Sequence, residues 1–206
     1  MAPPIPTNRT RDHSAVHAAT PTRDRLLITA AKPLRDIEPQ LHDLWLRCVS
    51  VSTLCFVIAR RLARVNADTA LLAGLLHGVG ALYIRTRAAA CPGLQPSEEA
   101  LADIQREWEA SIARALLEGW RVSEAIIEAV CALGQPDRDG HGPPGLGEVL
   151  RAGVVLDRAV RARRDIEIAI AGSAACARLG LTSVVHQTII QESEAEIAAL
   201  RGVLGS

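Results

Sequence analysis

The sequence has 206 residues, of which 49% are apolar and 22% are charged, and its 23 basic and 23 acidic residues give a formal net charge of zero. This length is enough for a domain with a buried core, and the balanced charge excludes a global field that would draw the protein to nucleic acid or to an anionic membrane. The five cysteines form no C-x-x-C pair, so they predict buried, reduced thiols in a cytoplasmic protein rather than a disulfide framework or a zinc ribbon.

The chain is expected to divide into a short leader and one domain. Residues 1–22 are rich in proline, threonine, arginine and alanine and show no apolar period, which predicts a disordered leader. Residues 23–206 are predicted to form a single helical domain. Its first element would be a short helix within residues 24–37, interrupted at Pro33. No segment shows the apolar length of a membrane helix, so we expect no contact with a membrane.

Two apolar helices follow. The first is predicted to begin at Pro39 and to carry an inner stripe with steps of four and three residues. That stripe contains Leu41, Trp45, Cys48, Ser52, Cys55, Ala59 and Leu62. The second, over residues 68–77, is apolar all round, so we expect it to be completely buried in the middle of a bundle. It ends in His77, and Gly78 and Gly80 then permit a tight turn.

The remaining elements are also predicted to be helices. Serine or threonine N-caps and glycine stops mark their ends. The predicted ranges are 82–90, 97–119, 123–133, 146–162, 165–179 and 182–200. The helix over 97–119 should turn Ile104 and Trp108 inward. No stretch alternates with a period of two, so the predicted fold class is all-α, a bundle of about seven to eight helices without a sheet.

Two further features lie in the last third of the chain. His141 falls in a flexible stretch over residues 135–147, and we expect it to be exposed rather than functional. The helix over 146–162 bears Asp157 and ends in a basic cluster, which is a candidate interaction surface. The cluster consists of Arg158, Arg161, Arg163 and Arg164. We expect no nucleic-acid partner, and DNA binding through this cluster is an alternative that salt-dependent binding to any duplex would support.

The run LAGLLHGVGAL around His77 resembles the AGLLHD signature of the HD superfamily of metal-dependent phosphohydrolases, in which the adjacent His and Asp ligate a metal ion. Gly78 follows His77 here, so this aspartate is missing. The preceding helix sharpens the resemblance to the HDOD family (HD-related output domain), a set of bacterial regulatory modules. Its LWLRCVSVS is similar to that family's LW-x-H-S motif, with Arg47 at the histidine and Cys48 at the serine.

Later segments extend the resemblance. The stretch EASIARALLEGWRVSEAIIEAV is similar to a family segment that begins with histidine, where this chain has Glu109, and the paired histidines that close the segment fall on Leu133 and Gly134. Asp157 matches the aspartate of a late A-D pair. The family usually has a further helical half ahead of the LW-x-H-S motif, whereas only about forty residues precede Trp45. The resemblance implies an HD-like bundle that lacks most of this half, as a short natural form or a fragment, and a homodimer is one way to cover the exposed surface.

The resemblance argues against a metal centre. Of the positions that ligate metal in the superfamily, only His77, Glu109 and Asp157 keep a suitable side chain. The vestigial pocket that it implies consists of Arg47, His77, Gly78, Glu109 and Asp157. We therefore expect no catalytic residue, no metal and no cofactor, and a regulatory or signalling module that binds a protein partner in trans or a small ligand. The alternative is a divergent metal-dependent phosphohydrolase that acts on a nucleotide with the three remaining ligands.

Two pairings are open for Asp157. A buried His77 could form a hydrogen bond with it, an arrangement that needs no metal. Asp157 could instead form a salt bridge with Arg47 that holds two helices in register. Such a pair stabilises the fold only when both charges are well hydrogen-bonded, because desolvation offsets most of the attraction.

Overall fold

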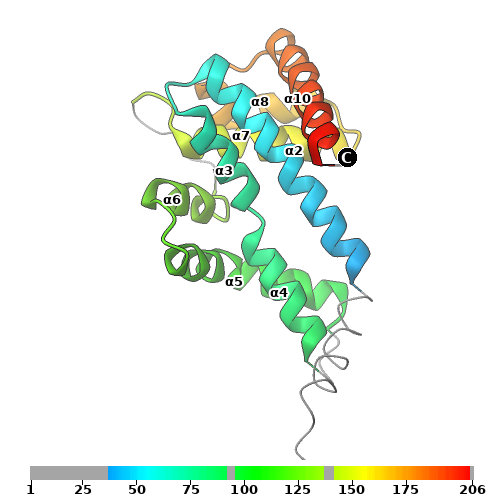
Figure 1. The fold of residues 1–206 in the computed structure, drawn as a ribbon. Coiled ribbons are helices and arrows are strands. Elements are labelled where there is room, and N and C mark those ends of the chain that lie inside the picture. The colour runs from blue at the N-terminus through cyan, green and yellow to red at the C-terminus, as the bar shows by residue number, and fades with distance from the viewer. Residues whose placement is uncertain (1–36, 92–95, 137–141, 205–206) are drawn as a thin grey trace, which may run out of the picture.

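The structure, a computed structural model, describes residues 37–91, 96–136 and 142–204. All regular elements in these three ranges are helices (Figure 1), which confirms the predicted all-α fold. The predictions for the leader, for the short helix around Pro33 and for His141 lie outside the described residues.

Nine helical segments follow one another along the described chain. They are α2 (Glu38–Leu62), α3 (Ala67–Leu76), α4 (Val79–Ala90), α5 (Glu98–Gly119), α6 (Glu124–Ala132), α7 (Leu146–Arg161), α8 (Ile166–Ala171), α9 (Ala174–Arg178) and α10 (Ser183–Leu204). The prediction of one helix over residues 165–179 is wrong, because α8 and α9 divide that stretch. The break falls at Ser173, whose hydroxyl accepts a hydrogen bond from the Cys176 N–H at 3.4 Å and so caps α9 as a separate helix.

Several predicted caps are confirmed. The Ser97 hydroxyl accepts a hydrogen bond from the Ala100 N–H at 3.2 Å at the start of α5. The Thr182 hydroxyl accepts one from the Val185 N–H at 3.4 Å ahead of α10. Gly180 ends α9 with φ 64, a left-handed conformation that glycine adopts without steric cost. These signals are local, so the sequence alone was sufficient to find them.

Helix α2 lies at the centre of the bundle (Figure 1). It packs along α3, α7 and α10, and it also contacts α4. Pro39 stands in its first turn, where the missing backbone N–H has no helical partner to lose. The main core forms around its second half from side chains that are almost completely buried. These are Val51, Thr53, Cys55, Ile58, Leu117, Ile127, Val149, Leu150, Leu156, Cys176 and Ile189.

Helix α3 is not completely buried, contrary to the prediction. Ala70, Ala73 and Gly74 lie in the interior, whereas Leu72 is 41% exposed. The small residues form the face that meets α2, since a Cβ built on Gly74 would lie 2.5 Å from the Ser52 Cα. So close a contact needs small side chains, and the leucines are displaced to the flanks of the contact.

The tryptophans are also more exposed than predicted. Trp45 on α2 and Trp108 on α5 were expected on inner stripes, but 52% and 51% of their surfaces are exposed. In the first half of α2, only Leu44 and Cys48 are buried, whereas the second half supplies the other eight buried residues of the helix. The helical period of a sequence predicts which residues form an apolar stripe. Which part of that stripe is buried depends on where the neighbouring helices pack.

Two helical stretches are long and apolar enough to span a membrane by length and composition, which the sequence-based expectation missed. They are Glu38–Leu62 and Ala67–Ala90, and 50% and 44% of their most apolar windows are buried inside the bundle. The core helices of a soluble protein pass the same test, so this observation is weak evidence for a membrane.

Candidate functional site

His77 lies at the junction of α3 and α4. Its Nδ1 is 2.6 Å from the Gly74 carbonyl oxygen, one turn back along α3. Burial lowers the pKa of His77 from its usual 6.5, although the hydrogen bond to Gly74 and the charge of Asp157 raise it. Because a carbonyl can only accept, Nδ1 carries the proton of the neutral ring and Nε2 keeps a lone pair. The ring therefore bonds to its own helix and not, as one prediction had it, to Asp157.

Gly78 is a point of close contact with α2. A Cβ built on it would lie 2.7 Å from the Cys48 Sγ and 3.2 Å from the Leu44 Cδ1. Burial raises the pKa of the Cys48 thiol, although the nearby Gly78 backbone and the charge of Arg47 lower it. Leu44, Cys48 and Ala81 form a small buried cluster separate from the main core. The space that a side chain after His77 would need is thus filled by a thiol and a leucine.

Glu109 reaches the same region from α5. A Cβ built on Gly80 would lie 2.5 Å from the Glu109 carbonyl oxygen and 2.9 Å from its Cγ, so the glycine lets α5 approach α4 closely. Burial raises the pKa of Glu109, although the charges of Arg47 and Arg85 lower it. Two glycines of the LAGLLHGVGAL run therefore bring two different helices up to His77, α2 at Gly78 and α5 at Gly80.

Asp157 is only 4% exposed and is neutralised by an arginine of its own helix. Its Oδ1 accepts a hydrogen bond from the Arg161 Nε at 3.1 Å, and the Arg161 Nη1 donates to the Asp43 Oδ1 of α2 at 3.0 Å. Arg47 pairs with the other oxygen of Asp43 at 3.4 Å. The prediction that Asp157 forms a salt bridge with Arg47 is therefore wrong, because Asp157 pairs with a different arginine. Arg161, one helical turn after Asp157, takes that place, and this i, i+4 spacing was the sequence signal that could have found it.

The structure thus brings the predicted pocket residues into one region. Arg47 is close enough to lower the pKa of both His77 and Glu109, and Asp157 acts on His77. The basic cluster, in contrast, divides into two parts. Arg161 belongs to the network with Asp157, whereas Arg158, Arg163 and Arg164 point to the surface.

The side chains present do not fit a metal centre. Within the described ranges, no three His, Cys, Asp or Glu side chains come together in a way that could hold a metal ion. Arg161 already occupies the Asp157 carboxylate, and Arg47 adds a second permanent positive charge nearby. A cation would have to compete with both guanidinium groups for the remaining acidic oxygens.

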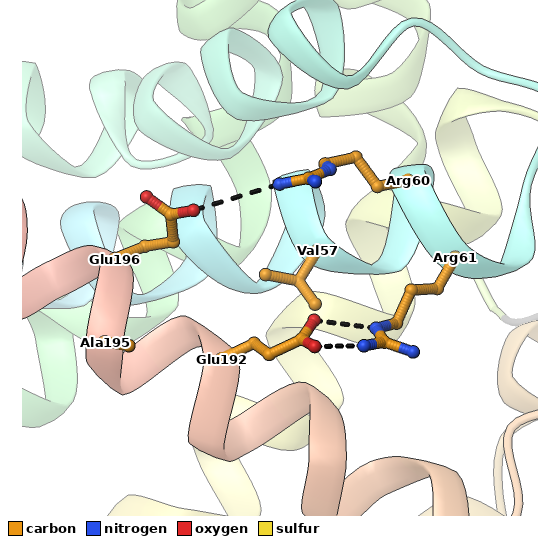
Figure 2. A pocket seen from close by; sticks show the side chains of 6 residues that line it. All are labelled: Val57, Arg60, Arg61, Glu192, Ala195 and Glu196. Carbon is orange, nitrogen blue, oxygen red and sulfur yellow. Dashed lines mark hydrogen bonds and ion pairs between the residues drawn. The ribbon is translucent and has the colours of Figure 1, made fainter.

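A hollow lies between α2 and α10 (Figure 2). It has a volume of about 310 Å³ and is lined by Val57, Arg60, Arg61, Glu192, Ala195 and Glu196. Arg61 pairs with Glu192 through two N–H donors, and Arg60 lies 3.9 Å from Glu196. Because two glutamates neutralise two arginines, the hollow has no charge left to select a ligand. We interpret the hollow as part of the packing interface between α10 and α2.

The bundle has the HD-like helical fold. One similar solved structure is a putative metal-dependent phosphohydrolase from Shewanella amazonensis SB2B, with a TM-score of 0.57 and 19% sequence identity. The match covers 82% of this chain and 65% of that chain, so this chain spans less than two thirds of its neighbour's length. None of the curated proteins compared with the chain matches it.

The HDOD domain model matches residues 26–136, more than half of the chain. The chain therefore belongs to the HDOD family. The match contains the segments around Arg47, His77 and Glu109, but it ends before Asp157. The role of Asp157 rests on its position in the structure and on the sequence resemblance alone.

Proposed function

We propose that the protein is a non-catalytic regulatory or signalling module of the HDOD type, which acts by binding a protein partner in trans or a small ligand. The packing at Gly78 carries this proposal. The superfamily places a metal-binding aspartate directly after the histidine, and here the Cys48 thiol and the Leu44 side chain fill that space. Restoring a carboxylate would require α2 to move away.

The charges of the pocket support the same proposal. Asp157 is buried and already paired with Arg161, which links it to α2 through Asp43. A guanidinium ion is a permanent cation that offers five N–H donors and no lone pair for a metal. The positive charge of the pocket therefore belongs to an arginine side chain and not to a bound ion. Its ion pairs join α7 to α2.

A divergent metal-dependent phosphohydrolase acting on a nucleotide is the second candidate function. One observation favours it: the Nδ1–H of His77 is held by a carbonyl, so its Nε2 lone pair is free to bind a cation. The Shewanella structure carries a description of that class, but at 19% identity it supports a shared fold only.

Metal analysis after expression with added manganese, iron and zinc separates the two candidates. It is combined with an assay of phosphodiester hydrolysis on bis(p-nitrophenyl) phosphate. We expect a metal content near zero per chain and no turnover above that of the His77→Ala variant. About one metal per chain, lost together with hydrolysis in His77→Ala, would replace the proposal by the second candidate.

A further inference from the structure

Three arginines around the end of α7 have no acidic partner within residues 37–91, 96–136 and 142–204. Arg158, Arg163 and Arg164 are all exposed and form no ion pair there, whereas Arg161 is used by Asp157 and Asp43. A cation near the C-terminus of a helix is favoured by the helix dipole, which accounts for one such residue but does not require three.

The cap of α7 folds the backbone of Arg163 and Arg164 back against the last turn of the helix. The Arg163 N–H bonds to the Val160 carbonyl at 3.1 Å and the Arg164 N–H to the Ala159 carbonyl at 3.0 Å, which is the Schellman arrangement. This cap places Arg163 at φ 50, in the left-handed region that glycine adopts freely and that side chains disfavour. Local stability therefore gives no reason for an arginine at this position.

An exposed isoleucine follows the arginines four residues after Arg164. Ile168, in the first turn of α8, is 72% exposed. The Asp165 carboxylate between them accepts hydrogen bonds from the N–H groups of Glu167 and Ile168, so it caps α8 instead of pairing with an arginine. Arginine is enriched at protein interfaces, and the exposed isoleucine adds apolar surface to the same corner.

We propose that the α7–α8 corner, formed by Arg158, Arg163, Arg164 and Ile168, binds an acidic segment of a partner protein. The carboxylates of that segment pair with the guanidinium groups, and an apolar side chain covers Ile168. This inference rests on the proposed regulatory function and names the chemistry of its partner.

Other polyanions fit the corner less well. Anionic bilayers are bound by clusters of about four to eight basic residues, and the corner offers three. A phosphate backbone would also meet the exposed Glu167 carboxylate, and no aromatic side chain lies in this part of α7 and α8 for base stacking. A protein segment can place carboxylates only where the arginines lie.

The test measures binding of a fluorescein-labelled peptide of alternating glutamate and leucine by fluorescence anisotropy at low salt. The corner variant combines Arg158→Ser, Arg163→Gly and Arg164→Ser. The matched control combines Arg64→Ser, Arg87→Ser and Arg121→Gly, three exposed arginines without ion pairs among the described residues, one of which is also left-handed. Both variants remove three positive charges. We expect affinity to fall about tenfold in the corner variant and less than about twofold in the control.

Ile168→Ser tests the apolar contact. It should weaken peptide binding about threefold without changing the salt dependence, because it removes apolar area and no charge. Thermal unfolding of every variant confirms that the fold is kept.

Three outcomes would overturn the inference. They are the absence of peptide binding at low salt, an equal loss in the corner and control variants, and tighter binding of duplex DNA or anionic vesicles that the corner variant abolishes. A different result would contradict the proposed function. Metal-dependent turnover would contradict the non-catalytic function and leave the peptide measurement unaffected. A flat peptide isotherm without turnover would contradict only the inference about the α7–α8 corner.

Discussion

Arg161 donates a hydrogen bond from Nε to the Asp157 Oδ1 at 3.1 Å, one turn away on α7, and its guanidinium also reaches Asp43 on α2. This bridge places a fixed cation beside a buried carboxylate of the pocket. It links the C-terminal end of α7 to the N-terminal half of α2, where only Leu44 and Cys48 are buried.

Arg161→Ala should destabilise the protein by about 1–3 kcal/mol, because it leaves the Asp157 carboxylate buried without its cation. Part of the effect is screened, since the Arg161 side chain is 34% exposed. Urea unfolding measures the loss. Arg106→Ala, which breaks an exposed pair with Asp103, is the control and should change stability by less than about 0.5 kcal/mol. Equal effects of the two variants would show that the bridge does not hold α7 to α2.

Gly78→Ala should destabilise the protein by about 1–3 kcal/mol, because the new methyl group meets the Cys48 Sγ and the Leu44 Cδ1. Gly119→Ala at the end of α5 is the control, since no atom lies within 4 Å of its added Cβ. In a double-mutant cycle, Cys48→Ala should recover part of the loss from Gly78→Ala. Strictly additive effects would contradict the close packing of Cys48 on Gly78.

Arg121→Gly and Arg163→Gly should each stabilise the protein by about 0.5–1 kcal/mol. Both arginines occupy left-handed caps, with φ 57 and φ 50, where glycine has no steric cost. Thermal unfolding is the measurement. Arg164→Gly is the control and should give no gain, because Arg164 is outside the left-handed region. A loss of stability in both glycine variants would mean that the arginine side chains contribute more than their backbone conformation costs.

Tryptophan fluorescence should resemble that of an exposed indole in the native protein. Trp45, Trp108 and Trp120 are exposed by 52%, 51% and 57%. We therefore expect efficient quenching by acrylamide and only a small shift of the emission maximum on unfolding. A blue shift that grows with protein concentration would instead reveal a homodimer that covers these side chains.

Stability should fall with acidification below about pH 6.5 in a manner that depends on His77. Burial lowers the pKa of this imidazole from its usual 6.5, so the unfolded chain takes up a proton before the folded protein does. The contribution is complete above that pH and is lost as the pH falls toward the folded-state pKa. Free energies of unfolding between pH 8 and pH 5 test this. His77→Gln should have a flatter profile than the native protein, and an unchanged slope in this variant would contradict the prediction.

Local signals in the sequence determined most of the helix boundaries. The Pro39 start, the Ser97 and Thr182 caps and the stop at Gly180 all depend on atoms within one turn, and the structure confirms each of them. The family resemblance is also local, since it rests on the order of short motifs, and the family match confirms it. The break at Ser173 was local too, but a run of small residues concealed it.

Only the tertiary structure decided which sides of these helices are covered. The sequence predicted a buried α3 and an inward Trp45, but Leu72 and Trp45 are exposed, because burial depends on helices that are distant along the chain. The choice of Arg161 over Arg47 as partner of Asp157 has the same origin. Both arginines carry the same charge, and only the packing of α7 against α2 sets which guanidinium reaches the buried carboxylate.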